Sequence, residues 1–345
     1  MLGLLARLEF ETFPFPRRTF CMAKKIVTIF GGSGFIGRYL VRALAPTGAA
    51  IRIASRSANH ASLCKSMGEV GQIAICSCNV RDRQSIQEVI SGSTAVVNLT
   101  GILYQRGLQN FDQIHREAPT RMASIAADAG VKTFVHISAI GANRKSIALY
   151  SKSKGEGEAE VRRVFRDATI IRPSLLFGPE DDFFNRFGAY SQFLPALPLI
   201  GGGNTKFQPV YVCDVAQSII WSLQNKEARG QTYELGGPRV MTFKELMELL
   251  LETIDRRRLL VPVPFWVSAV GGHLIESLFA LPAKMMPALT PAPPLTLDQV
   301  RLMREDNIVS EESPSFADIG ISPVSLETVL PSYLARFHPR ISARR

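Results

Sequence analysis

The chain has 345 residues, of which 46% are hydrophobic and 20% charged, so it can form one large domain with a smaller lobe. Its formal net charge of +10 at pH 7 suggests an anionic partner: a phosphorylated cofactor, an anionic lipid surface or nucleic acid. Nucleic acid is the weakest of the three, because the basic residues are dispersed and no zinc-finger or RNA-binding signature is present. The five cysteines form no paired framework, which indicates reduced thiols, and we expect no metal site.

Residues 1–23 form an N-terminal extension before the first predicted strand. They lack the long apolar core and small-residue cleavage site of a secretory signal. A mitochondrial presequence would be richer in Arg and Ser and poorer in acidic residues. Met22 is an equally good start for the chain, so the role of the extension stays open.

A strand, a glycine loop and a helix open the globular sequence. Residues 25–30 are mostly β-branched and apolar, which is typical of a buried parallel strand. Gly31, Gly34 and Gly37 follow, within a segment that becomes helical over 35–45. The first glycine permits a tight turn, the second lets the backbone approach a pyrophosphate, and the third allows close helix–strand packing. In this context the loop predicts dinucleotide binding at the helix N-terminus rather than an ordinary turn.

The end of the second predicted strand, residues 50–55, bears on the choice of cofactor. An NAD-selective site usually places Asp or Glu here to bind the adenosine ribose. This chain has no acidic residue from Arg38 through Gly68. Arg38 and Arg56 stand where a 2′-phosphate would lie, and each charge-assisted bond to it is worth roughly 1.5–3 kcal/mol. The alternative is that these arginines form a solvated face. We favour NADP(H) over NAD(H).

Three further strands are predicted at 72–77, 94–101 and 131–138. A helix through about residue 90 separates the first two, and a long helix over 110–129 separates the second pair. Gly130 is typical of the residue that ends such a helix. The last residues of the strand at 94–101 are expected to pass under the cofactor.

Ser138, Tyr150 and Lys154 form the candidate catalytic set. Tyr150 and Lys154 lie four residues apart on one helical face, twelve and sixteen residues after the strand-terminal Ser138. A lysine ammonium beside a tyrosine favours the phenolate, so we expect Tyr150 to act as acid or base closer to neutral pH. Lys154 can also donate to the nicotinamide ribose, while Ser138 polarises a carbonyl or hydroxyl. Whether the set still turns over a substrate stays open.

The second half of the chain, residues 179–337, is expected to supply late core strands and helices and a substrate or docking lobe. Strands are predicted over 169–178, 207–213 and 231–237. Asp214 is interpreted as a helix cap rather than a catalytic acid. Thr242 and Glu245 form a capping box for the helix after it.

The segment 259–281 is the last apolar stretch before a basic tail at 338–345. Its part after the prolines at 262 and 264 is shorter than the ~20 residues that a membrane span needs. As a helix it is apolar except for a narrow line through Ser268, Gly272 and Glu276. It packs on the protein's own core, or it docks on a membrane or a partner subunit.

The three-and-three spacing of the glycines resembles the extended and atypical short-chain dehydrogenase/reductase (SDR) superfamily. From residue 24 to about 337 the chain resembles the SDR-type accessory subunits of NADH:ubiquinone oxidoreductase (respiratory complex I) and their bacterial relatives. The segments that carry this resemblance are 31–41, 172–174, 177–185, 209–216 and 293–302.

The resemblance implies an α/β fold, a Rossmann-type doubly wound parallel sheet over 24–178 with a smaller C-terminal α/β lobe. It implies a tightly held NADPH with a structural role in complex I, at the respiratory membrane, on the matrix side in a eukaryote and cytoplasmic otherwise. The intact candidate catalytic set keeps open a free-standing NADP-dependent reductase or epimerase, acting on an unknown carbonyl or nucleotide-sugar-like substrate.

The resemblance also assigns cofactor contacts. In related proteins an acidic residue holds the adenine amine where this chain has Asn79, and a Pro–Ser pair lies near the carboxamide. The expected cofactor-binding residues are Gly31, Gly34, Phe35, Ile36, Gly37, Arg38, Ser55, Arg56, Asn79, Val80, Leu99, Thr100, Gly101, Tyr150, Lys154, Pro173 and Ser174.

Overall fold

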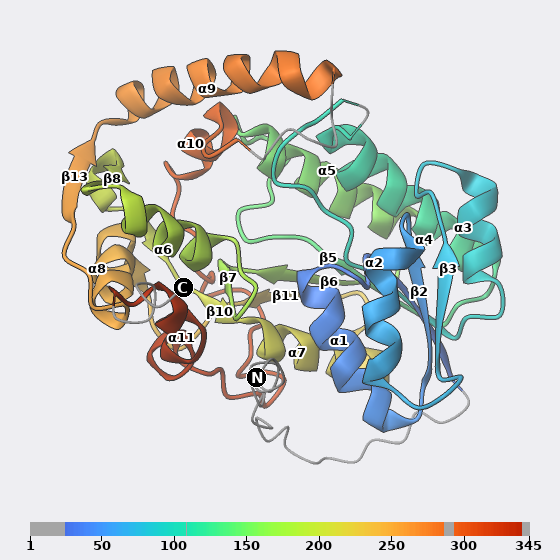
Figure 1. Cartoon of the computed structure of the whole chain (residues 1–345). Helices are drawn as coiled ribbons and strands as arrows, with labels where there is room; N and C mark the ends of the chain where they lie inside the picture. Colours follow the sequence, from blue (N-terminus) through green and yellow to red (C-terminus); the bar gives the residue numbers. More distant parts are fainter. Residues whose placement is uncertain (1–24, 108, 286–292, 340–345) are drawn as a thin grey trace, which may run out of the picture.

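The computed structural model describes residues 25–107, 109–285 and 293–339 (Figure 1). Its centre is a seven-stranded parallel sheet with the order β11-β6-β5-β4-β1-β2-β3. The strands are β1 (Ile26–Phe30), β2 (Ala50–Ser55), β3 (Ile73–Ser77), β4 (Ala95–Asn98), β5 (Thr133–Ile137), β6 (Thr169–Pro173) and β11 (Thr232–Leu235). The strand order reverses between β1 and β4, where α/β sheets bind ligands at the carboxyl ends of their strands. The predicted doubly wound α/β fold is confirmed.

Helices cover both faces of the sheet, which explains why its strands read as apolar runs. Side chains alternate along each strand, so Val135 faces one helical layer and Phe134 the other. The first layer contains α1 (Phe35–Leu44) and α7 (Val212–Gln224). The second contains α3 (Arg83–Ile90), α4 (Ala118–Asp128) and α5 (Leu149–Val164), while a short α2 (Ala58–Ser62) follows β2. The long helix predicted over 110–129 begins as a π-helical segment, Asp112–Glu117, before α4.

The smaller C-terminal part is built from short strand pairs and helices that share the core of the first layer. Its pairs are β7 (Leu176–Phe177) with β10 (Val210–Tyr211), β8 (Ala196–Ile200) with β13 (Leu259–Val263), and β9 (Lys206–Phe207) with β12 (Met241–Thr242). Its helices include α6 (Phe183–Phe193), α8 (Phe243–Thr253) and α11 (Leu326–Leu334). Phe183, Phe187 and Phe243 pack edge to face inside it. The domain boundary at residue 178 stays a prediction.

Two predicted helix caps, at Thr242 and at Asp214, have different outcomes in the structure. The predicted capping box of Thr242 and Glu245 at the start of α8 is confirmed. The interpretation of Asp214 as the cap of its own helix is wrong: its buried carboxylate accepts a hydrogen bond from the backbone N–H of Val324, at 2.8 Å. Asp214 therefore holds the C-terminal segment rather than the start of α7.

The apolar segment forms α9 (Phe265–Met285), which lies across α10 (Leu297–Leu302) at one side of the molecule (Figure 1). Ser268 and Gly272, two members of the predicted polar line, are buried against the protein, and the Glu276 side chain lies outside the described part. The outer face carries Trp266, which is 70% exposed, and Leu274, which is 64% exposed. No helix in the described ranges is long and apolar enough to cross a membrane.

Candidate nucleotide-binding site

The glycine loop joins β1 to α1 and leaves no room for a side chain at Gly37. Gly31 has a φ of +78°, a left-handed conformation that glycine adopts without strain. A Cβ on Gly37 would lie 2.5 Å from the carbonyl oxygen of Gly31, so the helix packs directly on the loop. Gly34 is the N-cap of α1 and supplies no side-chain acceptor to the N–H groups of the first turn. Those N–H groups and the helix dipole favour an anion at this position.

The end of β2 and the glycine loop form a small polar cluster. The hydroxyls of Ser33 and Ser55 lie 3.4 Å apart. Arg38 donates to the Ser33 carbonyl oxygen at 2.8 Å and forms an ion pair with Glu180 at 3.1 Å. Arg56 is exposed, and no acidic side chain of the described residues pairs with it. Of the two predicted phosphate-binding arginines, Arg38 already has an anionic partner and Arg56 does not.

Asn79 and Val80 follow β3, at the edge of the sheet. The side-chain oxygen of Asn79 accepts from the backbone N–H and the guanidinium of Arg81, at 3.2 and 3.4 Å. The carbonyl oxygen of Val80 accepts from Arg121 at 3.2 Å. Because an adenine amine donates hydrogen bonds, it would compete with Arg81 for the Asn79 oxygen.

The candidate catalytic set gathers at the carboxyl end of β5. The Lys154 ammonium donates to the carbonyl oxygen of Ile137 at 3.2 Å and lies 6.0 Å from the centre of the Tyr150 ring. Ser138 is 3% exposed, and its hydroxyl has no hydrogen-bond partner among the described residues. A Cβ on Gly101 would lie 3.5 Å from the Lys154 nitrogen, so the segment after β4 passes directly beside the lysine. The loop at Gly31 also contacts this segment, at Leu99 and Thr100.

The pKa values in this cluster differ from the sequence expectation. Burial raises the pKa of the Tyr150 phenol to about 12 and lowers the pKa of Lys154 to about 8. Desolvation therefore outweighs attraction from the lysine, whose ammonium does not contact the phenol ring closely. Tyr150 keeps its proton at neutral pH, which suits a proton donor better than a base.

His115, which no motif in the sequence indicates, lies beside Tyr150. Its ring stacks on Phe111 at 5.3 Å and meets the Tyr150 ring edge-on at 5.2 Å. Its Nε2 accepts from the backbone N–H of Ile102 at 3.1 Å, so the proton resides on Nδ1, 2.9 Å from the Ser153 hydroxyl. Burial lowers the pKa of His115 to about 2, which keeps the ring neutral. The neutral His115 ring therefore restricts the position of the Tyr150 ring by packing against it.

The approach of α5 to this histidine depends on a glycine. A Cβ on Gly157 would lie 1.9 Å from the carbonyl oxygen of His115, so only glycine fits between the two helices. Glycine inside a helix costs about 1 kcal/mol relative to alanine. Gly157, inside a predicted helix, was therefore the sequence signal for a close helix contact. Gly155 lies instead against the loop backbone at Asn143 and Arg144.

Pro173 and Ser174 lie at the end of β6, where the C-terminal segment crosses. The Ser174 hydroxyl is 2.9 Å from the backbone oxygen of Asn307 and 2.7 Å from its side-chain oxygen. Asn307 also donates to the carbonyl oxygen of Ile140 at 3.4 Å. The hydroxyl of Ser174 thus binds the C-terminal segment to the sheet, and its predicted contact with the carboxamide stays a prediction.

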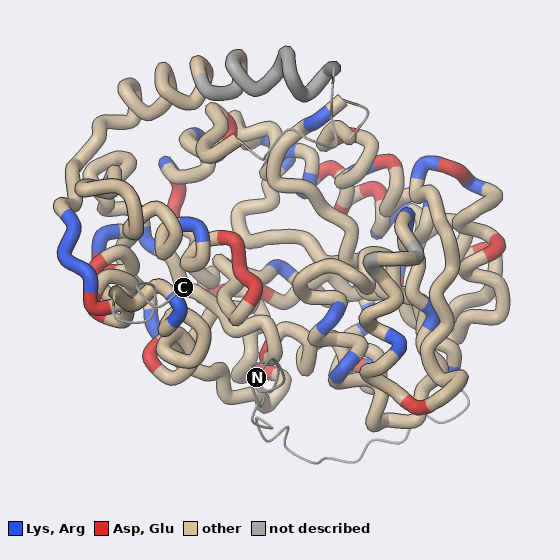
Figure 2. The backbone as a smooth tube through the Cα atoms, in the orientation of Figure 1, with Lys and Arg blue, Asp and Glu red and all other residues tan. Residues whose placement is uncertain are grey.

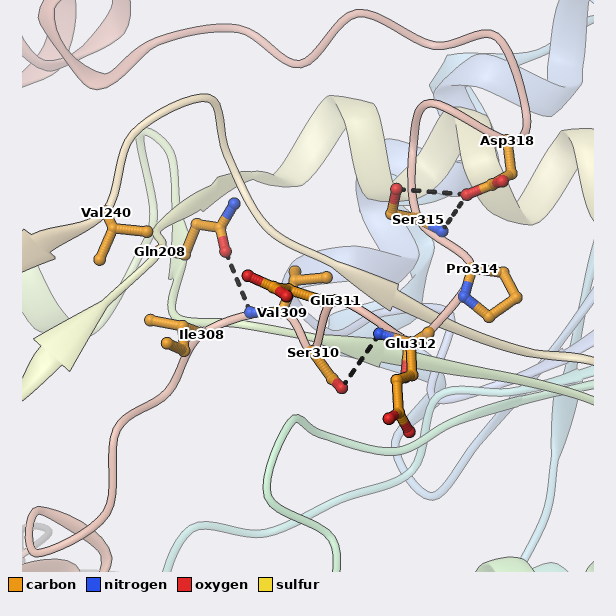
Figure 3. Close-up of a pocket in the computed structure, with 11 residues that line it drawn as sticks. Gln208, Val240, Ile308, Val309, Ser310, Glu311, Glu312, Pro314, Ser315 and Asp318 are labelled. Atoms are coloured by element: carbon orange, nitrogen blue, oxygen red, sulfur yellow. Dashed lines mark hydrogen bonds between the residues drawn. The ribbon is translucent and has the colours of Figure 1, made fainter.

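A pocket of about 630 Å³ lies apart from these residues (Figure 3). It is lined by the segment 308–315 together with Gln208, Val240 and Asp318, and by none of the predicted site residues. The side chain of Gln208 is already bonded to the backbone of Gly237 and Val309. The candidate nucleotide site is the one at the strand ends, where three features fit a dinucleotide: the glycine loop, the exposed Gly101 and the Ser138 hydroxyl, which has no partner among the described residues.

Comparison with known proteins identifies the family to which the chain belongs. A family model described as the NAD dependent epimerase/dehydratase family matches residues 27–236. The match covers more than half of the chain, so the chain belongs to this family, whose NAD(P)-binding type of domain agrees with the fold and the loop.

Individual relatives are more specific. The chain is 32% identical over 320 residues to the mitochondrial NADH dehydrogenase [ubiquinone] 1 alpha subcomplex subunit 9 of Arabidopsis thaliana, covering 90% of this chain and 78% of that protein. It is 34% identical over 305 residues to the protein of the same name from Rattus norvegicus, covering 88% and 78%. The expected resemblance to these subunits is confirmed. Among solved structures, DesIV, a dTDP-glucose 4,6-dehydratase from Streptomyces venezuelae with NAD and TYD bound, has a TM-score of 0.68 at 18% identity, covering 93% of this chain and 98% of that one.

Proposed function

We propose that this chain binds NADP(H) at the strand ends and supports respiratory complex I as an accessory subunit. The observation that carries the choice of NADP(H) is the basic end of β2, where Arg56 is exposed and without an acidic partner among the described residues. The complex I assignment is supported by the two relatives of that name, of which the chain covers 78%.

Different residues of the site would bind different parts of the cofactor. The loop of Gly31, Gly34 and Gly37 takes the pyrophosphate, and Arg56 takes the 2′-phosphate beside Ser55. Phe35, Ile36, Val80, Leu99, Thr100, Gly101 and Pro173 would line the cofactor, and Lys154 would donate to the nicotinamide ribose. The Arg38–Glu180 ion pair has to share its arginine with the phosphate, so Arg56 is expected to contribute more.

Calorimetry tests the cofactor choice. NADPH should bind at least tenfold more tightly than NADH, because one charge-assisted bond is worth roughly 1.5–3 kcal/mol. Arg56→Glu should remove most of this difference. Lys226→Glu is the matched control, since it makes the same charge change on an exposed side chain after α7. Equal affinities of the wild type for the two nucleotides would refute the proposal.

Docking at the respiratory membrane is the second part of the proposal, on the matrix side in a eukaryote. The outer face of α9 and the neighbouring strand β13 expose Trp266, Val270, Leu274 and Leu259. Figure 2 shows a basic run, residues 256–258, in the segment that leads into β13. Apolar burial at about 25 cal/mol per Å² and attraction of about 1 kcal/mol per well-placed arginine would favour an anionic bilayer.

Liposome flotation tests this docking. The protein should float with anionic vesicles at low salt, less at high salt, and Trp266→Glu should weaken flotation without loss of fold. Recovery of all wild-type protein in the unbound fraction at low salt would exclude the membrane part of the proposal. Co-purification with the respiratory complex tests the subunit assignment independently.

A free-standing NADP-dependent reductase or epimerase is the second candidate. It is favoured by the Ser138 hydroxyl, which has no hydrogen-bond partner in the described part of the chain, and by the nearby Lys154. A bound nicotinamide would supply hydride transfer. Ser138 would polarise the substrate oxygen, and the protonated Tyr150 would donate a proton to it. Tyr150→Phe should then abolish NADPH oxidation by a carbonyl compound while nucleotide affinity stays nearly unchanged. Turnover that survives this substitution would exclude Tyr150 as the acid.

A further inference from the structure

The N-terminus of α5 is capped by a residue that lies 148 positions later in the chain. The helix has Ala148 as its N-cap, which supplies no side-chain acceptor. The carboxylate of Asp298 takes that place: one oxygen accepts from the N–H of Leu149 at 2.7 Å, the other from the N–H of Tyr150 at 2.9 Å. Asp298 is 9% exposed, so its carboxylate is largely shielded from water.

Tyr150 belongs to the turn that this carboxylate holds. It is the second residue of α5, and the first turn of a helix has N–H groups without partners in the helix and frays when they are left uncapped. Lys154 lies one turn further on, inside the hydrogen-bonded part of the helix, and is anchored to Ile137. Within the first turn, the Asp298 contact therefore holds the N–H of Tyr150 in place. The Tyr150 carbonyl oxygen accepts from the Ser153 hydroxyl at 2.9 Å, and His115 packs against the ring.

Asp298 is itself held by the C-terminal part. It lies in the first turn of α10, whose capping box of Thr296 and Gln299 fixes the start of that helix. A Cβ on Gly272 of α9 would lie 3.1 Å from the backbone nitrogen of Leu297, so α9 rests directly on this turn. Two helix N-termini thus meet at one carboxylate, an arrangement that the positive ends of both helix dipoles favour.

We propose that Asp298 is a positioning residue for Tyr150, which connects the α9–α10 unit to the nucleotide site. One part of this inference rests on the proposed function, namely that Tyr150 lies at a nucleotide site. The geometric part, that Asp298 fixes the first turn of α5, stands independently of any ligand.

The test is the variant Asp298→Asn in the full chain. An asparagine offers one acceptor and one donor in place of two acceptors, so one of the two N–H groups would face a donor. The chain is labelled with tyrosine carrying ¹³C at Cζ, and the Tyr150 signal is assigned among the seven tyrosines with Tyr150→Phe. Asp298→Asn should shift or broaden the Tyr150 signal, while NADPH affinity stays nearly unchanged, as it does for Tyr150→Phe.

The matched control is Asp306→Asn, in the same segment, whose carboxylate accepts a single backbone N–H, from Lys206 at 2.8 Å. It should change neither readout, because asparagine keeps one acceptor. A folded Asp298→Asn protein with an unchanged Tyr150 signal would overturn the inference, even if its stability were lower. If the wild type does not bind NADPH, the proposed function fails and the Tyr150 signal still decides the role of Asp298. If Asp298→Asn does not fold, amide exchange in the wild type decides: slow exchange at Leu149 and Tyr150 supports the inference, and fast exchange overturns it.

Discussion

Replacing Arg172 with methionine should destabilise the protein by about 3 kcal/mol. The guanidinium of Arg172, on β6, bonds both carboxylate oxygens of Glu158 on α5, at 2.9 and 2.6 Å. It also bonds Glu234 on β11 at 3.1 Å. Both glutamate side chains are 8% exposed. The ion triad therefore binds the helix that carries Tyr150 to the sheet.

The magnitude follows from what the substitution leaves behind. Breaking a buried ion pair by removing one partner typically costs about 3–5 kcal/mol, because the remaining charge stays desolvated. Arg172 itself is 24% exposed, so water can reach the site and the lower end of that range applies. Glu234 keeps a hydrogen bond from the N–H of Ser310, at 2.9 Å. A second substitution, Glu158→Gln, removes one stranded charge and should recover about half of the loss.

Urea unfolding followed by circular dichroism at pH 7 measures this effect. The control is Arg163→Met, which removes an exposed arginine paired with Glu160 on the same helix and should cost at most about 0.5 kcal/mol. A loss below about 1 kcal/mol for Arg172→Met, or a loss equal to that of the control, would refute the argument that the triad is a desolvated anchor.

Three further predictions concern other positions. Burial raises the pKa of Asp214 to about 6, above its value in the unfolded chain, so the protonated form favours the folded state. The free energy of unfolding should therefore fall by up to about 3 kcal/mol as the pH rises from 4 to 6. The effect of Asp214→Asn on the free energy of unfolding should therefore be more favourable at pH 7 than at pH 4.5, and equal effects at both would contradict it. Gly157→Ala should cost more than about 2 kcal/mol in urea unfolding, whereas Gly271→Ala, which meets nothing within 4 Å in α9, should be neutral or stabilising. Ser174→Ala should lower stability by about 1 kcal/mol through its lost bond to Asn307, and no change in the urea midpoint would contradict that.

The sequence predicted the features that depend on neighbours along the chain. The glycine loop, the parallel strands and the capping box of Thr242 follow from local spacing, and the structure has all three. The prediction that Asp214 caps its own helix is wrong. An acidic residue at a helix start is typical of a cap, but the partner of Asp214 is Val324, which is 110 residues away. Local spacing contains no information about such a partner.

In the candidate site too, features set by local spacing were predicted and features set by packing were not. Tyr150 and Lys154 were predicted from their four-residue spacing, which a helix turns into one face. The neutral His115 and the lowered lysine pKa come from burial, which depends on how α5, the π-helical segment and the sheet pack together. A single histidine in a helical stretch does not indicate that packing, whereas Gly157 in α5 does.

The long-range cap of α5 has a consequence for how the protein is made. Translation at about 5–20 residues per second separates the synthesis of Tyr150 from that of Asp298 by about 7–30 s. During that time the nascent chain can already form the sheet as far as β6 and its flanking helices, but the first turn of α5 has no acceptor. The same late segment supplies Val324 for Asp214 and Tyr333 for the buried carboxylate of Asp181. A chain truncated before residue 298 would therefore have the complete glycine loop but no cap on the first turn of α5, which contains Tyr150.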